Sequence, residues 1–222
     1  MSIKKRAISE EQKLERKNNI LKTALELFKN SSFEKINIEE IAKKTGIAKG
    51  TVFLYFKTKE ELFLSLAKEK IGKLFNDLDG SLIELNKNKK ECSVKDLLGI
   101  IKNSTNNKPL LIRLMAILNI ILEKNIDFKT ASDFKIMLYN NIIKTGALLE
   151  QCFSFLKSGD GTQLIMWIYI LIIGIHQVSD PSPVAKKVIN EAGLNIFNIN
   201  FNDQFLNMIK IIIKGLQNKS KD

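Results

Sequence analysis

A chain of 222 residues, 45% hydrophobic and 27% charged, can bury a substantial core, which excludes disordered and fibrous classes. Its formal net charge of +11 is concentrated early, because residues 1–75 hold 17 Lys and Arg against 10 Asp and Glu. A basic first third suits a polyanionic partner, although a well-solvated surface explains the same charge. Only three prolines occur, and the apolar residues recur at helical spacing, so we expect an all-α fold.

The N-terminal residues, the cysteines and the apolar runs of the sequence indicate the cellular compartment of the protein. Cys92 and Cys152 lie far apart in sequence, which predicts reduced thiols rather than a disulfide framework or a metal site. The first 17 residues lack the apolar stretch of a signal peptide. The longest apolar run, Leu164–Ile175, is shorter than the roughly 20 residues that cross a bilayer. We therefore expect a cytoplasmic protein with no membrane partner.

The chain opens with a basic arm and a long helix. Lys4, Lys5 and Arg6 belong to a segment that either reaches along DNA or is a charged tail. Ser9 and Gln12 form a capping box that begins the first helix. Its apolar stripe should pack beneath the next helices, together with Phe33 and Ile36 of the following loop; the stripe comprises Ile20, Leu21, Ala24, Leu25, Leu27 and Phe28.

Residues 37–59 predict two short helices joined by a tight turn. Asn37 and Glu40 suggest a capping box at the start of the first helix. Gly46 fits the left-handed position that ends it. The second helix restarts at Ala48, with Val52 and Phe56 directed toward the core. This is a helix-turn-helix whose second helix has the size of a DNA major groove.

The stretch from Phe33 through Leu62, including GIAKGTVFLYFKTKEEL, resembles the DNA-binding half of TetR-type transcriptional repressors. The resemblance implies an N-terminal DNA-binding domain at residues 9–75, with the motif at 37–56. A larger helical domain for ligand sensing and dimerisation would follow at 76–222. Ser32 stands where the family has glycine before the aromatic residue, so this turn should differ slightly.

The residues expected to contact double-stranded DNA begin the second helix of the motif or follow it: Lys49, Gly50, Thr51, Phe53, Leu54, Tyr55 and Lys59. Gly50 removes a side chain where the helix would come closest to the duplex, and Thr51 has a hydroxyl for phosphate. Two positions depart from the family. Phe53 lacks the hydroxyl of a common tyrosine, and Leu54 replaces a residue that is often polar or aromatic. Phe53 and Leu54 packing inward remains an open alternative.

The rest of the chain predicts further helices. The first, from Thr58 to about Leu78, would belong to both halves of the molecule. Others are expected at 93–104, 109–124, 132–157, 161–179 and 202–217. The helix at 161–179 is apolar on nearly all sides, and the one at 202–217 has a similar excess, so both need cover. A homodimer through these two helices provides that cover, and the family resemblance implies it; a purely intrachain core is the alternative.

The second half should also contain a pocket for a small-molecule effector, apolar or aromatic in character. Candidate residues lie on the helix containing Leu110–Leu122 and on its successors: Arg113, Met115, Phe134, Met137, Tyr139, Met166, Trp167 and Tyr169. Each is also explained as an ordinary core residue. Arg113 would meet an anionic group or point to solvent.

The sequence contains no catalytic motif that we could identify and only one histidine, His176, which we expect in the core or at an interface. No enzyme activity, cofactor or metal is expected. The sequence instead predicts a homodimeric, ligand-responsive transcriptional regulator, most simply a repressor, that binds a palindromic operator. The alternative is a helical ligand-binding or protein-interaction module with a degenerate helix-turn-helix.

Overall fold

The computed structural model describes residues 9–88, 92–106 and 108–219. The described part contains helices and no strand, which confirms the all-α prediction. The elements are α1 (Glu10–Asn30), α2 (Ile38–Thr45), α3 (Lys49–Phe53), α4 (Lys59–Asn88), α5 (Val94–Thr105), α6 (Pro109–Ile117), η1 (Leu118–Leu122), α7 (Phe128–Cys152), α8 (Asp160–Ser179), α9 (Pro183–Glu191), η2 (Asn195–Phe197) and α10 (Phe201–Lys219). The predicted basic arm, Lys4 to Arg6, lies outside the described residues.

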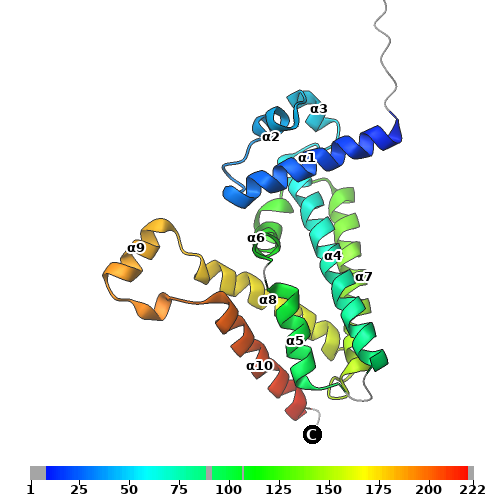
Figure 1. The fold of residues 1–222 in the computed structure, drawn as a ribbon, viewed down its shortest axis with the longest axis vertical. Coiled ribbons are helices and arrows are strands. Elements are labelled where there is room, and N and C mark those ends of the chain that lie inside the picture. Colours follow the sequence, from blue (N-terminus) through cyan, green and yellow to red (C-terminus); the bar gives the residue numbers. More distant parts are fainter. Residues whose placement is uncertain (1–8, 89–91, 107, 220–222) are drawn as a thin grey trace, which may run out of the picture.

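Helices α1, α2 and α3 form a small unit at one end of the molecule (Figure 1). The predicted Ser9–Gln12 capping box is present at the start of α1. The α1 stripe is buried as expected, except that Leu25 is only partly so. Phe33 and Ile36 are 5% and 1% exposed. The Phe63 ring of α4 meets the Phe28 and Phe33 rings edge-on, so α4 is part of this core.

Helix α4 ends ten residues later than expected and joins the two ends of the molecule (Figure 1). It continues past Leu78 because Leu82 is fully buried and Leu85 packs against the same core. Asp79, 3% exposed, accepts a hydrogen bond from Thr145 of α7 and lies 2.8 Å from the Lys144 ammonium. A buried carboxylate with these partners fixes α4 against α7.

Two predicted helices have different boundaries. The one expected at 109–124 divides into α6 and the π-helical turn η1. Helix α7 begins four residues early because the Asp127 side chain accepts a hydrogen bond from the Thr130 amide and caps it. It ends at Cys152, before a turn whose Phe153 and Leu156 are buried.

Helices α7 and α8 pack closely where two glycines face each other. A Cβ added at Gly161 would lie 2.2 Å from the Gly146 carbonyl oxygen, so this approach requires glycine. The Glu150 carboxylate accepts hydrogen bonds from the amides of Gly159 and Gly161, both 2.9 Å. The start of α8 is therefore held against the side of α7.

Helix α8 is only partly covered by its own chain. By length and apolar composition it meets the criteria for a helix that crosses a membrane, criteria that core helices of soluble proteins also meet. The whole helix is thus longer than the apolar run that the sequence indicated, and the absence of a membrane partner stays a prediction. Only 22% of the qualifying stretch is fully buried within the described structure. Part of the apolar surface of α8 is therefore exposed to solvent in this single chain.

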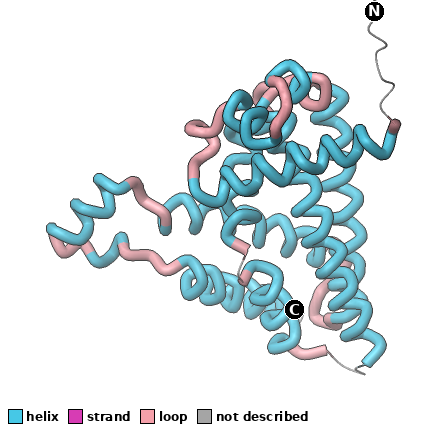
Figure 2. Tube along the Cα trace, turned by 45° about the horizontal axis from the view of Figure 1, so that its top comes forward, coloured by secondary structure: helices cyan, strands magenta, loops and turns pink. Residues whose placement is uncertain are grey.

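Between α8 and α10 the chain forms a projecting segment that we did not predict from the sequence. Pro183 is the first residue of α9. Figures 1 and 2 show α9 and its flanking turns projecting to one side of the helical body. The signal was present, because serine followed by proline is typical of a helix start.

Candidate DNA-binding surface and effector cavity

The turn between α2 and α3 is fixed by its caps. The Asn37 side chain accepts a hydrogen bond from the Glu40 amide at 2.8 Å, as expected. The reciprocal bond of a capping box is not made, since the Glu40 carboxylate lies 3.8 Å from the Lys44 ammonium instead. Gly46 has φ +72°, and Ile47 is half-buried. Val52 and Phe56 anchor α3 from below.

The outer face of α3 is open to solvent. The Lys49 side chain is 56% exposed, with Glu39 at 3.9 Å as a distant ion pair. Nothing lies within 4 Å of a Cβ added at Gly50. Phe53 and Leu54 are 43% and 84% exposed, so neither packs inward. Thr51 and Tyr55 are half-buried at the edges of the same face. The start of α3 therefore presents a cation, a bare backbone and exposed apolar side chains.

Lys59, an expected DNA contact, has internal partners in this structure. Its ammonium donates hydrogen bonds to the carbonyl oxygens of Phe33 and Ile36, at 2.8 and 2.9 Å. It also lies 4.0 Å from the centre of the Phe33 ring. Burial lowers the pKa of Lys59 below its ordinary value. The side chain ties the α1–α2 loop to the start of α4, and its contact with DNA stays a prediction.

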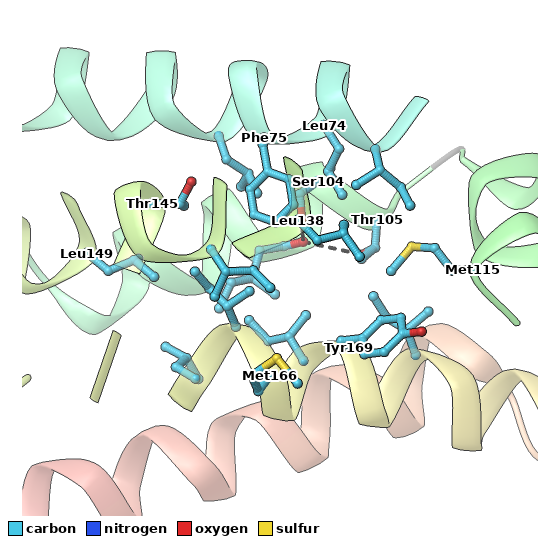
Figure 3. Close-up of a pocket in the computed structure, with 18 of the residues that line it drawn as sticks. Leu74, Phe75, Ser104, Thr105, Met115, Leu138, Thr145, Leu149, Met166 and Tyr169 are labelled. Atoms are coloured by element: carbon cyan, nitrogen blue, oxygen red, sulfur yellow. Dashed lines mark hydrogen bonds between the residues drawn. The ribbon is translucent and has the colours of Figure 1, made fainter. Parts of the chain in front are cut away.

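A cavity of about 430 Å³ lies between α4, α5, α6, η1, α7 and α8. In Figure 3, Leu74 and Phe75 of α4 lie on one side and Met166 and Tyr169 of α8 on the other. Most lining side chains are aliphatic, including Ile71, Leu78, Leu97, Ile101, Leu118, Ile142 and Ile172. The polar exceptions have protein partners: the Asn119 amide donates to the Tyr169 hydroxyl at 3.0 Å, and Thr145 donates to Asp79.

Four of the eight predicted pocket residues line this cavity: Met115, Tyr139, Met166 and Tyr169. The other four do not. Phe134 is an ordinary core side chain, 1% exposed, and Met137 packs beside it on α7. Trp167 points to a groove between α8 and α10, lined also by Ile170 and Ile212. Sequence reasoning missed the contributions of α4 and α5, because their apolar stripes look like those of any packed helix.

Arg113 also lies outside the cavity, where it joins α6 to the DNA-binding end. Its guanidinium donates to the carbonyl oxygens of Phe28 and Ser31, at 2.8 and 2.5 Å. It stacks 4.3 Å from the centre of the Phe28 ring. These carbonyls belong to the end of α1, where carbonyl groups lack helical partners and favour a cation. The expectation of an anion or solvent as its partner was wrong.

The segment after η1 makes a second connection to the DNA-binding end. The Thr58 hydroxyl donates to the Asn125 carbonyl oxygen at 3.1 Å, and the Asn125 amide donates to Glu60 at 3.3 Å. The Lys57 ammonium lies 3.2 Å from the Asp127 carboxylate. The residues in the middle of the segment from α6 through Asp127 therefore line the cavity. Residues before and after them in the same segment contact the DNA-binding end.

Burial affects two titratable groups near α8. It raises the pKa of the Tyr169 phenol, whose partner at the cavity is Asn119. It lowers the pKa of His176, so the half-buried imidazole favours its neutral form. Both pKa shifts result from the apolar surroundings of this helix.

Comparison with known families matches nearly the whole chain. Residues 20–66 match the family described as bacterial regulatory proteins, tetR family. Residues 69–220 match a tetracyclin repressor-like C-terminal domain. The two matches meet within α4, the helix that enters both ends of the molecule.

Curated relatives match about a third of this chain or less. The fatty acid metabolism regulator protein of Bacillus subtilis is 35% identical over 65 residues, 29% of this chain. The uncharacterized HTH-type transcriptional regulator YerO of the same species is 42% identical over 64 residues, also 29% of this chain. The matched regions span only 34% and 22% of those relatives. Their effectors therefore do not follow for this chain.

Solved structures match over most of the chain with low identity. The regulator FadR from Bacillus subtilis, in complex with stearoyl-CoA, has 20% identity and a TM-score of 0.51, covering 86% of this chain and 96% of its own. The fatty acid degradation regulator FadR from Bacillus halodurans has 16% identity and a TM-score of 0.51, covering 91% and 96%. At such identities the likeness establishes the fold alone.

Proposed function

The chain belongs to the TetR family of transcriptional regulators, and on that basis we propose that it is a ligand-responsive repressor acting as a cytoplasmic homodimer on a palindromic operator. The observation that carries the proposal is the open face of α3 on a capped helix-turn-helix. In a dimer, two such helices enter successive major grooves on one side of the duplex.

Six of the seven predicted DNA contacts lie on or beside the open face of α3, whereas Lys59 also has internal partners. Lys49 supplies the charge near phosphate or base edges. Gly50 allows the backbone to approach the duplex closely because no side chain stands there. The exposed Phe53 and Leu54 are suited to sugar and thymine methyl groups.

Exposed apolar side chains on two helices support a homodimer. On α8, Ile170 is 58% exposed, and on α10, Ile211 is 69% exposed. Trp167 lines the groove between these helices on the outer surface. A second copy presenting the same surface around a two-fold axis would bury all of them in a bundle of four helices.

The effector that we propose is an uncharged, largely apolar molecule. The cavity volume lies within the range of about 300–1,000 Å³ that is common for ligand sites. Lys135, the charged residue that lines the cavity, has its ammonium 2.8 Å from Glu123. Asn119 and Tyr169 provide a hydrogen-bonding pair for one polar group of the ligand. The structure of FadR from Bacillus subtilis is a complex with stearoyl-CoA, whose acyl chain is apolar but whose CoA group is charged, so it supports only the apolar part of this proposal.

The effector would act through the segment from α6 to Asp127. Met115, Leu118 and Asn119 face the cavity, while Arg113 and Asn125 contact the DNA-binding end. A ligand that displaces this segment would change how α1 and the start of α4 are held. Operator affinity falls only if the ligand prefers the displaced arrangement.

DNA binding is tested with duplexes from the region upstream of the gene, titrated at several salt concentrations. We expect salt-sensitive binding, because phosphate contacts release counterions. Lys49→Ala should weaken it by roughly tenfold. Lys73→Ala, which removes the same charge from an exposed site on α4, should change it less than twofold. Equal losses of DNA affinity with the two substitutions would show that α3 is not part of the binding surface.

The cavity is tested with the neutral apolar dye Nile red. We expect one saturable site per chain, weakened by Leu138→Trp because the larger ring fills the cavity. Asn140→Trp, on the exposed face of the same helix, should leave dye binding unchanged. Dye binding that is insensitive to Leu138→Trp would place the site elsewhere.

A further inference from the structure

Helix α9 and its flanking turns, residues 180–200, form a projecting segment that we call the arm. Its conformation is specified locally at both ends. The Ser182 hydroxyl caps α9 by accepting from the Ala185 amide at 3.3 Å, and Pro183 occupies the first turn. At the other end, Gly193 has φ +65° and the Leu194 amide donates to the Ile189 carbonyl oxygen at 2.9 Å. The arm is thus an encoded structure rather than an irregular loop.

The arm lacks the packing that such a helix needs. None of the nine residues of α9 is buried, and the element it packs against is the short turn η2. Isolated helices shorter than about 12–15 residues are marginal in water. Figures 1 and 2 both show the arm extending away from the helical body. Its stability must therefore come from a surface outside this chain.

The arm presents the apolar stripe of a helix that packs against protein. Val184 and Val188, one turn apart on α9, are 75% and 52% exposed. Ile196 and Phe197 in η2 are 83% and 55% exposed. Lys186 and Asn190 lie on the other side of α9 and are exposed as well. One apolar and one polar face indicate contact on the apolar face only.

The position of the arm indicates what covers it. It connects α8 to α10, the two helices whose exposed side chains form the proposed dimer interface. Val178, 51% exposed near the end of α8, continues that apolar surface directly into the arm. A two-fold axis at α8 and α10 makes any contact of one arm with the second copy reciprocal, so the same contact forms twice.

We propose that the arm packs its apolar face on the body of a second copy of this chain, so that the two copies of a dimer exchange arms. The inference rests on the homodimer of the proposed function and extends its interface beyond α8 and α10. Each protomer then stabilises the α9 helix of the other. The arm contributes to the free energy of association through the burial of Val184, Val188, Ile196 and Phe197.

Photo-cross-linking tests the contact without disturbing it. Phe197 is replaced by p-benzoyl-phenylalanine, and the purified full chain is irradiated. We expect a covalent product of twice the chain mass of 25.3 kDa. The same replacement at Phe128, an 88% exposed phenylalanine at the start of α7, should give little of this product. Cross-links confined to single chains, or none, would overturn the proposal.

Substitution tests the contribution to association. Val184→Asp with Val188→Asp should raise the dimer dissociation constant by about tenfold or more, measured by sedimentation, because charges would be buried. Lys186→Gln with Asn190→Asp makes the same change of two charges on the polar face and should change it less than threefold. Equal dissociation constants for the two double variants would overturn the proposal.

Failure of the arm contact is distinct from failure of the proposed function. A wild-type chain that sediments as a dimer but gives no cross-link at Phe197 contradicts only the arm. A wild-type chain that remains a monomer at all concentrations contradicts both the arm and the homodimeric repressor.

Discussion

Two lysines ten residues apart have opposite environments, although each is the first residue of a helix. Lys49 extends from the first turn of α3 with its side chain 56% exposed. Lys59 turns inward and uses its ammonium on two carbonyl oxygens of the α1–α2 loop. Charge at a helix start therefore does not by itself identify a DNA contact. Whether the lysine binds within the protein or extends into solvent depends on whether unpaired backbone carbonyls lie within reach of its side chain.

Substitution of Lys59 is expected to reduce the stability of the fold more than it reduces direct contact with DNA. Lys59→Ala leaves the Phe33 and Ile36 carbonyl oxygens without this donor and should cost about 1–3 kcal/mol of unfolding free energy. Urea denaturation measures the loss. Lys49→Ala, at a solvent-exposed site, should change stability by less than about 0.5 kcal/mol. A Lys59→Ala protein as stable as the wild type would contradict the internal role.

The two cysteines should differ in reactivity at pH 8. Burial, together with the neighbouring Cys92 thiol, raises the pKa of Cys152 to about 11. Its thiol also donates to the Leu82 carbonyl oxygen at 3.4 Å. The nucleophilic thiolate is therefore scarce at Cys152 below its pKa, whereas Cys92 is half-buried. The two thiols are neighbours in the fold, which their sequence separation concealed.

Ellman's reagent measures this difference. We expect one fast thiol in the folded protein and a second that reacts only as the protein unfolds. Cys92→Ser should abolish the fast phase. Two equally fast thiols in the native protein would show that Cys152 is accessible and ionised.

At the scale of elements, the sequence predicted which segments are helical better than it predicted how each segment ends. Capping and periodicity located α1, α2 and α5 closely, because local hydrogen bonds and one apolar face determine them. The length of α4 depends on Leu82 packing against distant helices. The division of α6 from η1 likewise depends on contacts with α4 and α8. Periodicity in one segment contains no information about such partners.

Arg113 supplies the clearest link between elements that the sequence concealed. Arg113→Ala removes the donor to the end of α1 and should cost about 1–3 kcal/mol, measured by urea unfolding. Arg113→Lys keeps the charge but not the planar fork, so its loss should be intermediate. Hydrogen exchange should quicken at the end of α1 in the alanine variant. Unchanged exchange there would show that α6 does not hold α1.

At the scale of the whole molecule, the apolar excess of the 161–179 and 202–217 segments predicted a surface that one chain leaves open. The structure leaves Ile170 and Ile211 exposed, in agreement with that reasoning. The cavity was only partly predictable, because its wall combines α4, α5, α7 and α8 from separate parts of the chain. The candidates that failed, such as Trp167, lie on the right helix but on its outer face. Only the packed arrangement distinguishes the faces.

The central claim is that two copies of this chain read a two-fold symmetric DNA sequence through α3. The most direct measurement is selection of bound duplexes from a random pool by the purified full chain, followed by sequencing. We predict enrichment of a palindrome whose half-sites lie about one helical turn apart, at roughly 10 base pairs, or a multiple of that spacing. The enrichment should be lost with Lys49→Ala. A wild-type protein that enriches no palindrome would contradict the account.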